Sequence, residues 1–463
     1  VNEKRDCSDF RLIILVYMYV RFSSRFSEKL RKDVEDAMAG YRYWADEPGD
    51  DVMWFFSENH ALMFHICQYF AGKSMPERMF TCSGLTGAQA ARKAEGLLDA
   101  WFESFFTEFA TEWNSSTYLP IDVMAYLYDL TEKGSSLHEK AKKALDMLAF
   151  SLAVNEHKGN IMTSFGRTYE RELKGSYSTG MPSLLYLFYN AGHMNDHFRA
   201  LVPVVVGDYE PPEEYKQFVN LSGEEELIHQ NTQGIGGFVN LYLYKNSRAL
   251  LSTAVGFRPY GPGYQENIVQ ADLDGTAQVF INHPGETEIY GNGRPGFWAG
   301  NGCLPLAVQY RNISILEYHI GSGSRLDYTH AYIPLSEFES FKLSGRSAAL
   351  EKDGGFIGVR ALNGLHRQTE GHCRNREFIS PGRDNVWVLK VGACGEYRNV
   401  DELLDDMERM EISMGEDGKV TVTDGTSRYE IENNKLYVNG ESVHHYPLDV
   451  AGHLVITGGK ENG

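Results

Sequence analysis

The feature that most constrains the fold is a change of sequence pattern near residues 205–235. Before this point apolar residues recur every three or four positions, as in Ile121–Leu130 and Leu137–Val154, which predicts amphipathic helices. After the Pro- and acid-rich linker Asp208–Tyr215, short runs rich in β-branched and aromatic residues alternate with Gly, Asn and Asp turns, which predicts strands. The chain therefore combines a helical part with a mostly antiparallel β part.

About seven or eight helices are predicted in the first part, which is typical of paired helices in an incomplete α/α toroid rather than of a four-helix bundle. The β part has predicted strands at 238–246, 277–283, 312–320 and 386–392, an acidic helix at 400–410, and short strands over 419–443. We expect an α+β multidomain chain with the toroid at 1–225 and a β-sandwich at 226–463. A small C-terminal β subdomain could begin near residue 400.

Composition narrows the classes of partner. With 44 Lys+Arg against 63 Asp+Glu the net charge is -19, and no basic patch stands out, so neither nucleic acid nor a membrane is an expected partner. The longest apolar run, Leu12–Val20, is about half of what a bilayer span needs and predicts a buried helix. Six scattered cysteines without a CxxC pair indicate reduced thiols.

Oligomeric state stays open. Localisation does too: secreted or cell-envelope if a signal precedes Val1, cytoplasmic otherwise.

Three stretches contain side chains suited to chemistry. In Trp54–Gly72, Asn59 and His60 lie where a polar segment enters an apolar helix, so both could face an anion at a helix N-terminus. The alternative is structural: Ser57 or Asn59 caps the helix and His60 packs under a neighbour.

The second stretch, Ser164–Glu172, has Arg167 and Tyr169 after a glycine. Arginine binds carboxylates in a bidentate manner, and tyrosine can transfer a proton when cations lie nearby. The third, Glu112–Pro120, has Trp113 and Tyr118 before a helix, where aromatic rings could stack on sugars. Surface ion pairing and core packing are the structural alternatives for these residues.

Together these stretches resemble the heparinase II/III and alginate/chondroitin lyase group, which joins an α/α toroid to an antiparallel β-sandwich. The resemblance implies that Asn59, His60 and Arg167 surround a uronate carboxylate while Tyr169 acts as base and acid. Tyr118 is the reserve candidate for the tyrosine, because relatives often place the Tyr before the Arg. The resemblance also implies a second catalytic histidine from the sandwich, and His283 is placed best by order.

The Gly- and Asn-rich stretch Ile281–Asn312 predicts long loops that reach towards a cleft, with Arg294 and Trp298 as substrate-binding candidates beside Trp113 and Tyr118. No cofactor is expected for β-elimination. Some relatives hold a structural zinc, and potential ligands are present without a recognisable ligand spacing: His319, Asp327, His330, His366, His372 and Cys373.

The expected function is thus a polysaccharide lyase that acts on an anionic, uronic-acid-containing glycan. One alternative is a glycoside hydrolase on a similar toroid, with Glu58 and either Asp122 or Glu170 as its carboxylates. Another is a non-catalytic glycan-binding protein. Because the chain is acidic overall, a lyase needs a locally positive cleft, for which these residues could supply the charge: Arg92, Lys93, Arg167, Arg171, Lys174 and Arg294.

Overall fold

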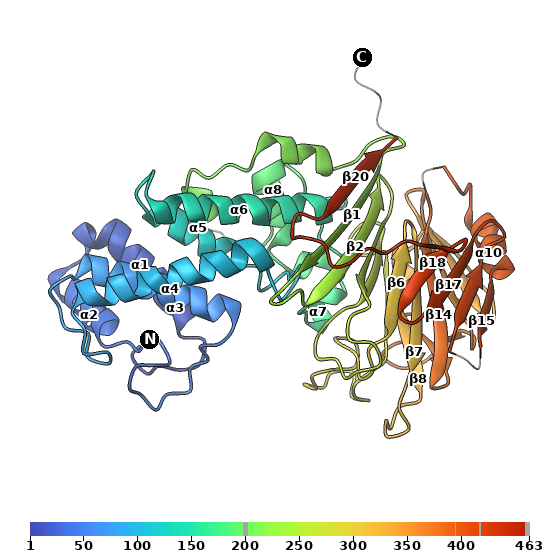
Figure 1. Cartoon of the computed structure of the whole chain (residues 1–463), viewed down its shortest axis with the longest axis horizontal. Coiled ribbons are helices and arrows are strands. Elements are labelled where there is room, and N and C mark those ends of the chain that lie inside the picture. The colour runs from blue at the N-terminus through green and yellow to red at the C-terminus, as the bar shows by residue number, and fades with distance from the viewer. Residues whose placement is uncertain (198–201, 394, 416–417, 459–463) are drawn as a thin grey trace, which may run out of the picture. The chain divides into compact units, whose positions relative to one another are not determined.

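The computed structural model describes residues 1–197, 202–393, 395–415 and 418–458. Helices dominate the chain up to Phe218, and strands dominate from Glu226 onward (Figure 1). The predicted α+β class, in which a helical part precedes a mostly antiparallel β-sandwich, is confirmed. By their contacts the described residues form two compact units: the first comprises 1–110, 118–149 and 202–212, and the second comprises 111–117, 150–197 and the chain from 213 onward.

The helices of the first unit are α1 (Asp9–Phe22), α2 (Glu28–Ala39), α3 (Glu58–Ser74), α4 (Gly87–Glu108), α5 (Ile121–Leu130), most of α6 (Ser136–Asn155) and α9 (Val202–Val206). The second unit holds α7 (Glu170–Leu173), α8 (Met181–Tyr189) and α10 (Val400–Arg409). Short 3₁₀ turns lie at Ser23–Arg25, Ser176–Ser178, Glu213–Phe218 and Leu335–Glu337.

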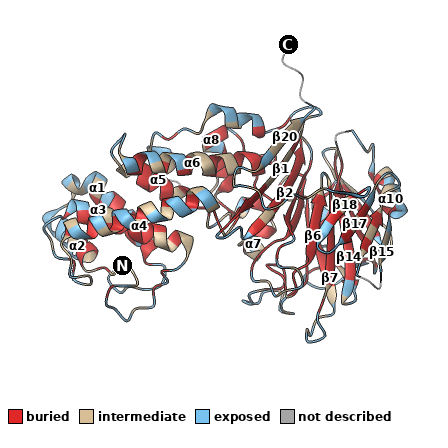
Figure 2. Ribbon diagram, viewed as in Figure 1, coloured by how far each residue is buried: buried red, intermediate tan, exposed pale blue. Residues whose placement is uncertain are grey.

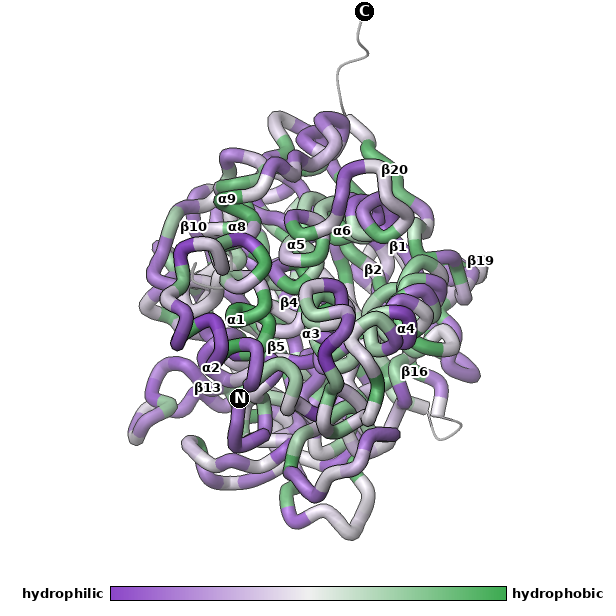
Figure 3. The backbone as a smooth tube through the Cα atoms, turned by 90° about the vertical axis from the view of Figure 1, so that its left-hand side faces the viewer, coloured by the Kyte–Doolittle hydropathy of each residue, from purple (hydrophilic) through white to green (hydrophobic). Residues whose placement is uncertain are grey.

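The apolar run 12–20 lies within α1, which is largely hydrophobic beside the more hydrophilic α2 (Figure 3). Among the described residues, no helix combines the length and the apolar character that crossing a bilayer requires. Five cysteines are described, and they are free thiols, whereas Cys394 lies outside the described residues.

Two glycines allow α3 and α4 to approach closely. A Cβ atom added at Gly72 of α3 would lie 2.4 Å from the backbone oxygen of Gly87, the first residue of α4. A Cβ atom at Gly87 would lie 2.0 Å from the backbone oxygen of Met75. The first turn of α4 is stabilised by a capping box between Thr86 and Gln89. The position of α3, which carries Asn59 and His60, therefore depends on two residues that have no side chain.

The described strands form three antiparallel sheets. The large sheet contains β1 (Glu226–Gln233), β2 (Val239–Asn246), β3 (Leu250–Val255), β4 (Val269–Asp272), β5 (Gln278–Asn282), β8 (Tyr328–Tyr332), β12 (His366–Arg367), β13 (Glu377–Pro381) and β20 (His453–Thr457). The inner sheet contains β6 (Leu306–Tyr310), β7 (Ile313–His319), β9 (Ser340–Leu343), β10 (Ser347–Lys352), β11 (Gly355–Ala361) and β14 (Asp384–Val391). The terminal sheet contains β15 (Glu411–Met414), β16 (Val420–Thr423), β17 (Arg428–Glu432), β18 (Lys435–Val438) and β19 (Glu441–Ser442).

The large and inner sheets pack face to face around one hydrophobic core. Leu251 of β3 and Ile281 of β5 share this core with Trp387 of β14. A second core lies on the other face of the inner sheet, where Leu403 and Met407 of α10 pack with residues of the terminal sheet. The inner sheet is thus covered on both faces, which explains why its central strands β7 and β14 are buried along almost their whole length (Figure 2).

β20, which lies near the end of the described chain, is the edge strand beside β1 in the large sheet. β20 pairs antiparallel with β1, with Leu227 opposite Ile456 and His229 opposite Leu454. β1 pairs on its other side with β2. Without β20, β1 would be an edge strand whose backbone N–H and C=O groups are open to other chains.

Candidate active site

Asn59 and His60 lie in the first turn of α3 in the first unit. Ser57 is the N-cap, because its hydroxyl accepts a hydrogen bond from the backbone N–H of His60 at 3.2 Å. The buried side chain of Asn59 donates to the backbone carbonyl of Tyr118 at 2.5 Å. Of the two cap candidates, Ser57 therefore has the capping role, and Asn59 joins the start of α3 to the segment before α5.

His60 forms a close pair with a buried carboxylate. Its Nδ1 atom lies 2.6 Å from Oδ2 of Asp9, whose side chain is only 1% exposed. The ring of Phe10 contacts the imidazole edge-on at 5.4 Å. A carboxylate at Nδ1 holds the proton on that nitrogen and fixes the ring orientation, which leaves Nε2 to interact with a ligand. Asp9 could not be found from the sequence pattern, because it lies 51 positions before His60.

In the second unit, the backbone of residues 163–169 runs beside residues 265–267. Phe165 and Asn267 exchange two backbone hydrogen bonds of 2.9 and 2.8 Å, and the N–H of Gly166 donates to the carbonyl of Trp113 at 2.8 Å. A Cβ atom at position 166 would lie 2.5 Å from the Trp113 ring, so this approach requires glycine. The backbone before Arg167 is therefore fixed on both sides.

Arg167 and Tyr169 lie together, although they are two residues apart. One guanidinium nitrogen, Nη2, donates to the phenol oxygen of Tyr169 at 3.4 Å, and the guanidinium carbon lies 5.7 Å from the centre of that ring. Arg167 also forms an ion pair of 3.5 Å with Glu112, and its side chain is 16% exposed. The tyrosine hydroxyl thus has a fixed positive charge beside it.

Tyr264 adds a second tyrosine to this group, one that the sequence reasoning missed. The guanidinium carbon of Arg167 lies 5.2 Å from the centre of the Tyr264 ring. Arg294, an exposed residue, donates from Nη1 to the Tyr264 hydroxyl at 3.0 Å. Tyr264 could have been noticed as a candidate because it ends the loop sequence GPGY between predicted strands, and functional residues are frequent on such loops.

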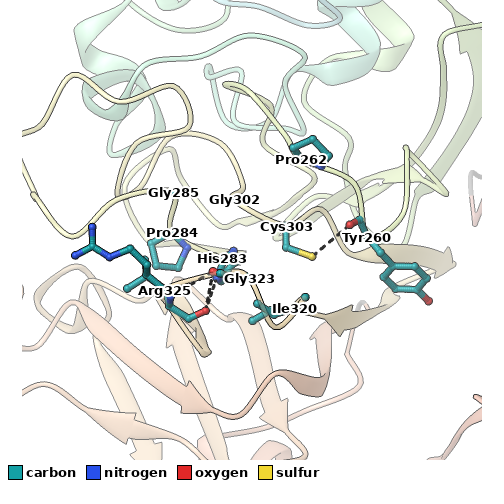
Figure 4. A pocket seen from close by; sticks show the side chains of 13 residues that line it. Tyr260, Pro262, His283, Pro284, Gly285, Gly302, Cys303, Ile320, Gly323 and Arg325 are labelled. Atoms are coloured by element: carbon teal, nitrogen blue, oxygen red, sulfur yellow. Dashed lines mark hydrogen bonds between the residues drawn. The ribbon is translucent and has the colours of Figure 1, made fainter.

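His283 is buried at a cavity of about 440 Å³ in the second unit (Figure 4). Cys303, Tyr260 and Arg325 are among the other lining residues. The Nε2 atom of His283 lies 3.2 Å from the carbonyl of Leu326, and burial lowers the pKa of the imidazole. The carbonyl can only accept, so His283 donates from Nε2.

Two of the residues expected to bind substrate, Trp113 and Trp298, are buried in the structure. Trp113 is 0% exposed and packs edge-on against Phe257 at 5.0 Å in the sandwich core. Trp298 is 1% exposed and stacks in parallel on His330 at 4.3 Å. Neither indole presents a face to solvent, so both are packing residues, which for Trp113 is the alternative stated from the sequence. Exposed aromatic rings lie elsewhere: Trp54 and Phe56, 57% and 70% exposed, contact each other just before α3.

The potential zinc ligands do not converge among the residues that the structure describes, where no group of three His, Cys, Asp or Glu side chains is arranged to hold a metal ion. His330 uses both ring nitrogens, one with Glu377 at 2.7 Å and the other with the carbonyl of Phe297 at 3.1 Å. His319 lies between Glu317 and Asp384, 2.6 Å from each. These histidines have partners within the protein.

Most of the cations expected to make the cleft positive are paired with carboxylates. Lys93 pairs with Asp46 and Glu47, Arg171 with Glu172 and Lys174 with Glu170. Within the described part of the chain, Arg92 and Arg294 have no carboxylate at ion-pair distance. Arg294 is therefore the cation beside the Arg167–Tyr169 pair that is not neutralised by an acidic neighbour.

The candidate carboxylates for a hydrolase are divided between the two units. Glu58 begins α3 and Asp122 lies in the first turn of α5, both in the first unit, whereas Glu170 begins α7 in the second. Burial raises the pKa of Asp122 to about 6. A carboxyl group with such a pKa can hold a proton near neutral pH, as a general acid must.

No protein-family model matches the sequence, and no curated protein matches it. Solved structures with a similar arrangement include heparan sulfate lyase HepC from Pedobacter heparinus, at 11% identity and a TM-score of 0.41, covering 95% of this chain and 75% of that one. A mutant of the same lyase gives 11% identity and a TM-score of 0.42 over 90% and 70% of the two chains. This likeness is remote, so the function has to be inferred from the residues of the chain itself.

Proposed function

We propose that this protein is a polysaccharide lyase that cleaves a uronic-acid-containing glycan by β-elimination. The observation that carries the proposal is the Arg167–Tyr169 pair, in which a guanidinium nitrogen lies 3.4 Å from a phenol oxygen. This pair combines a group that binds a carboxylate with a group that transfers a proton. The pair is held by the backbone contacts of Phe165 and Gly166.

In the proposed reaction, the carboxylate of a uronate binds Arg167. The oxygen of Tyr169, in its deprotonated form, removes the proton from C5, which is α to that carboxylate. The electron pair forms the C4–C5 double bond, the bond from C4 to the glycosidic oxygen breaks, and Tyr169 returns a proton to the leaving oxygen. The guanidinium stabilises the charge that develops on the carboxylate, an effect worth about 3–4 kcal/mol per preorganised donor. The step needs no cofactor.

Asn59 and His60 of the first unit are a separate proposal, as donors to an anionic group of the substrate. Nδ1 of His60 lies 2.6 Å from the Asp9 carboxylate, so Nε2 is the ring nitrogen that would face the substrate. A double-variant cycle tests this: if His60 and Arg167 act on one substrate group, the combined variant should lose less activity than the product of the two single losses. Multiplicative losses would mean that His60 acts independently of Arg167.

The first experiment is ultraviolet absorbance during incubation with alginate, chondroitin, hyaluronan, heparan sulfate, glucuronan and pectin. Elimination leaves a conjugated C4–C5 double bond that absorbs, whereas hydrolysis leaves none. We expect a rising signal with at least one polymer, its near abolition in Tyr169→Phe, and wild-type rates in Tyr437→Phe. Tyr437 is a matched control because it lies on β18 of the terminal sheet.

A glycoside hydrolase is the second candidate, and the raised pKa of Asp122 is the observation in its favour. Its signature would be new reducing ends without new absorbance, and loss of this activity in Asp122→Asn. If neither absorbance nor reducing ends appear with any polymer, a non-catalytic glycan-binding role replaces both.

A further inference from the structure

Arg294 is held in place by an aromatic residue rather than by an acid. Its Nη1 atom donates to the hydroxyl of Tyr264 at 3.0 Å, and its guanidinium carbon lies 5.9 Å from the centre of that ring. A guanidinium has five N–H donors, so most of them remain available in this arrangement. In a chain of net charge -19, an exposed arginine that is oriented without a carboxylate is a prepared site for an external anion.

Tyr264 also contacts the proposed carboxylate-binding residue. The guanidinium carbon of Arg167 lies 5.2 Å from the same ring centre. Because the two guanidinium carbons lie 5.2 and 5.9 Å from the same ring centre, they are at most about 11 Å apart. Neighbouring sugars of a glycan chain can place two anionic groups at such a separation.

The backbone around Tyr264 is well fixed. Its N–H donates to the buried carboxylate of Glu266 at 2.5 Å, and the N–H of Gly263 donates to the carbonyl of Asn301 at 2.9 Å. Asn301 is itself buried. The separation of the two guanidinium groups is therefore set by ordered loops, which allows it to select among substrates.

We propose that Arg294 and Tyr264 form a second anion subsite, which binds a carboxylate or sulfate on the sugar next to the uronate held by Arg167. This inference rests on the proposed function and narrows its substrate class. The preferred glycan carries anionic groups more densely than one carboxylate per disaccharide. Tyr264 is a positioning residue, since it orients Arg294 through its hydroxyl.

The test measures dissociation constants of size-matched oligosaccharides by calorimetry, in a Tyr169→Phe background that prevents turnover. The three probes are an alginate, with a carboxylate on every sugar, a sulfated heparan, and a hyaluronan, with a carboxylate on every second sugar and no sulfate. Arg294→Gln should weaken binding of the alginate, the heparan or both by about tenfold or more, because charge-assisted hydrogen bonds are lost. It should weaken binding of the hyaluronan by less than about threefold. Which of the two anion-dense probes responds identifies carboxylate or sulfate as the ligand.

Arg409→Gln is the matched control, because it removes the same charge from α10 on the inner sheet. Arg294→Lys should recover part of the lost affinity, and Tyr264→Phe should reproduce part of the loss without changing net charge. Three outcomes would overturn the subsite. Arg294→Gln could lose the same affinity for all three oligosaccharides, Arg409→Gln could lose as much affinity as Arg294→Gln, or none of the probes could bind. The proposed lyase activity fails independently, if wild-type protein generates no absorbance although the Arg294-dependent affinity difference is present.

Discussion

Replacing Gly72 by alanine would test how closely α3 and α4 must approach. The added Cβ atom would lie 2.4 Å from the oxygen of Gly87 and 2.8 Å from the nitrogen of Ala91. Both are backbone atoms near the start of α4, so the clash is relieved only if the two helices separate. Overpacking of this kind costs about 3 kcal/mol at the upper end of its usual range, and alanine returns about 1 kcal/mol of helix propensity. We expect a net loss of about 2 kcal/mol.

The assay is thermal and urea unfolding followed by circular dichroism at 222 nm, a wavelength at which helices dominate the signal. A loss of about 2 kcal/mol should lower the midpoint of the helical unit by about 4–8 °C. Gly96→Ala is the matched control, because this exposed glycine lies within α4 and a Cβ atom there meets nothing within 4 Å. It should stabilise the protein by about 0.5–1 kcal/mol. If Gly72→Ala stabilises the protein as Gly96→Ala does, the close approach is wrong.

Two further changes test the environment of residues that the sequence singled out. Asp122→Asn should remove a pH dependence of stability. The folded protein keeps the Asp122 proton up to about pH 6 whereas the unfolded chain releases it near pH 3.8, so the unfolding free energy of the wild type falls by up to about 3 kcal/mol as pH rises between these values. If urea unfolding gives the same dependence of unfolding free energy on pH for both proteins, this reasoning is contradicted. Trp113→Ala should cost about 3–5 kcal/mol, because it empties a fully buried site, and a loss below 1 kcal/mol would show that the indole is not in the core.

Elements with a clear hydrophobic period were predictable from the sequence. The helix predicted at 121–130 is α5, and the strand predicted at 312–320 contains β7, Ile313–His319. The DG, NN and NG turns over 419–443 separate β16, β17, β18 and β19. In these segments the side that is buried alternates with a fixed period, so the pattern of apolar residues reports the structure directly.

The residues on irregular segments were much less predictable. Trp113 and Tyr264 are both aromatic residues on loops, yet one is fully buried and the other is 42% exposed beside two arginines. A loop has no period that indicates which side faces the core, so composition cannot separate the two cases. The pairing of Asp9 with His60 was unpredictable as well, because the two residues lie on different helices and are 51 positions apart in the sequence. Such contacts are products of tertiary packing.

The pairing of β20 with β1 has a consequence for synthesis of the chain. Residues 226–233 leave the ribosome long before residues 453–457, which cover their open edge. During translation of the intervening stretch, the nascent sheet exposes that edge to neighbouring nascent chains on the same polysome. A chaperone that shields β1 until residues 453–457 have emerged should therefore raise the yield of folded protein. A stop codon placed before His453 should leave a product that self-associates.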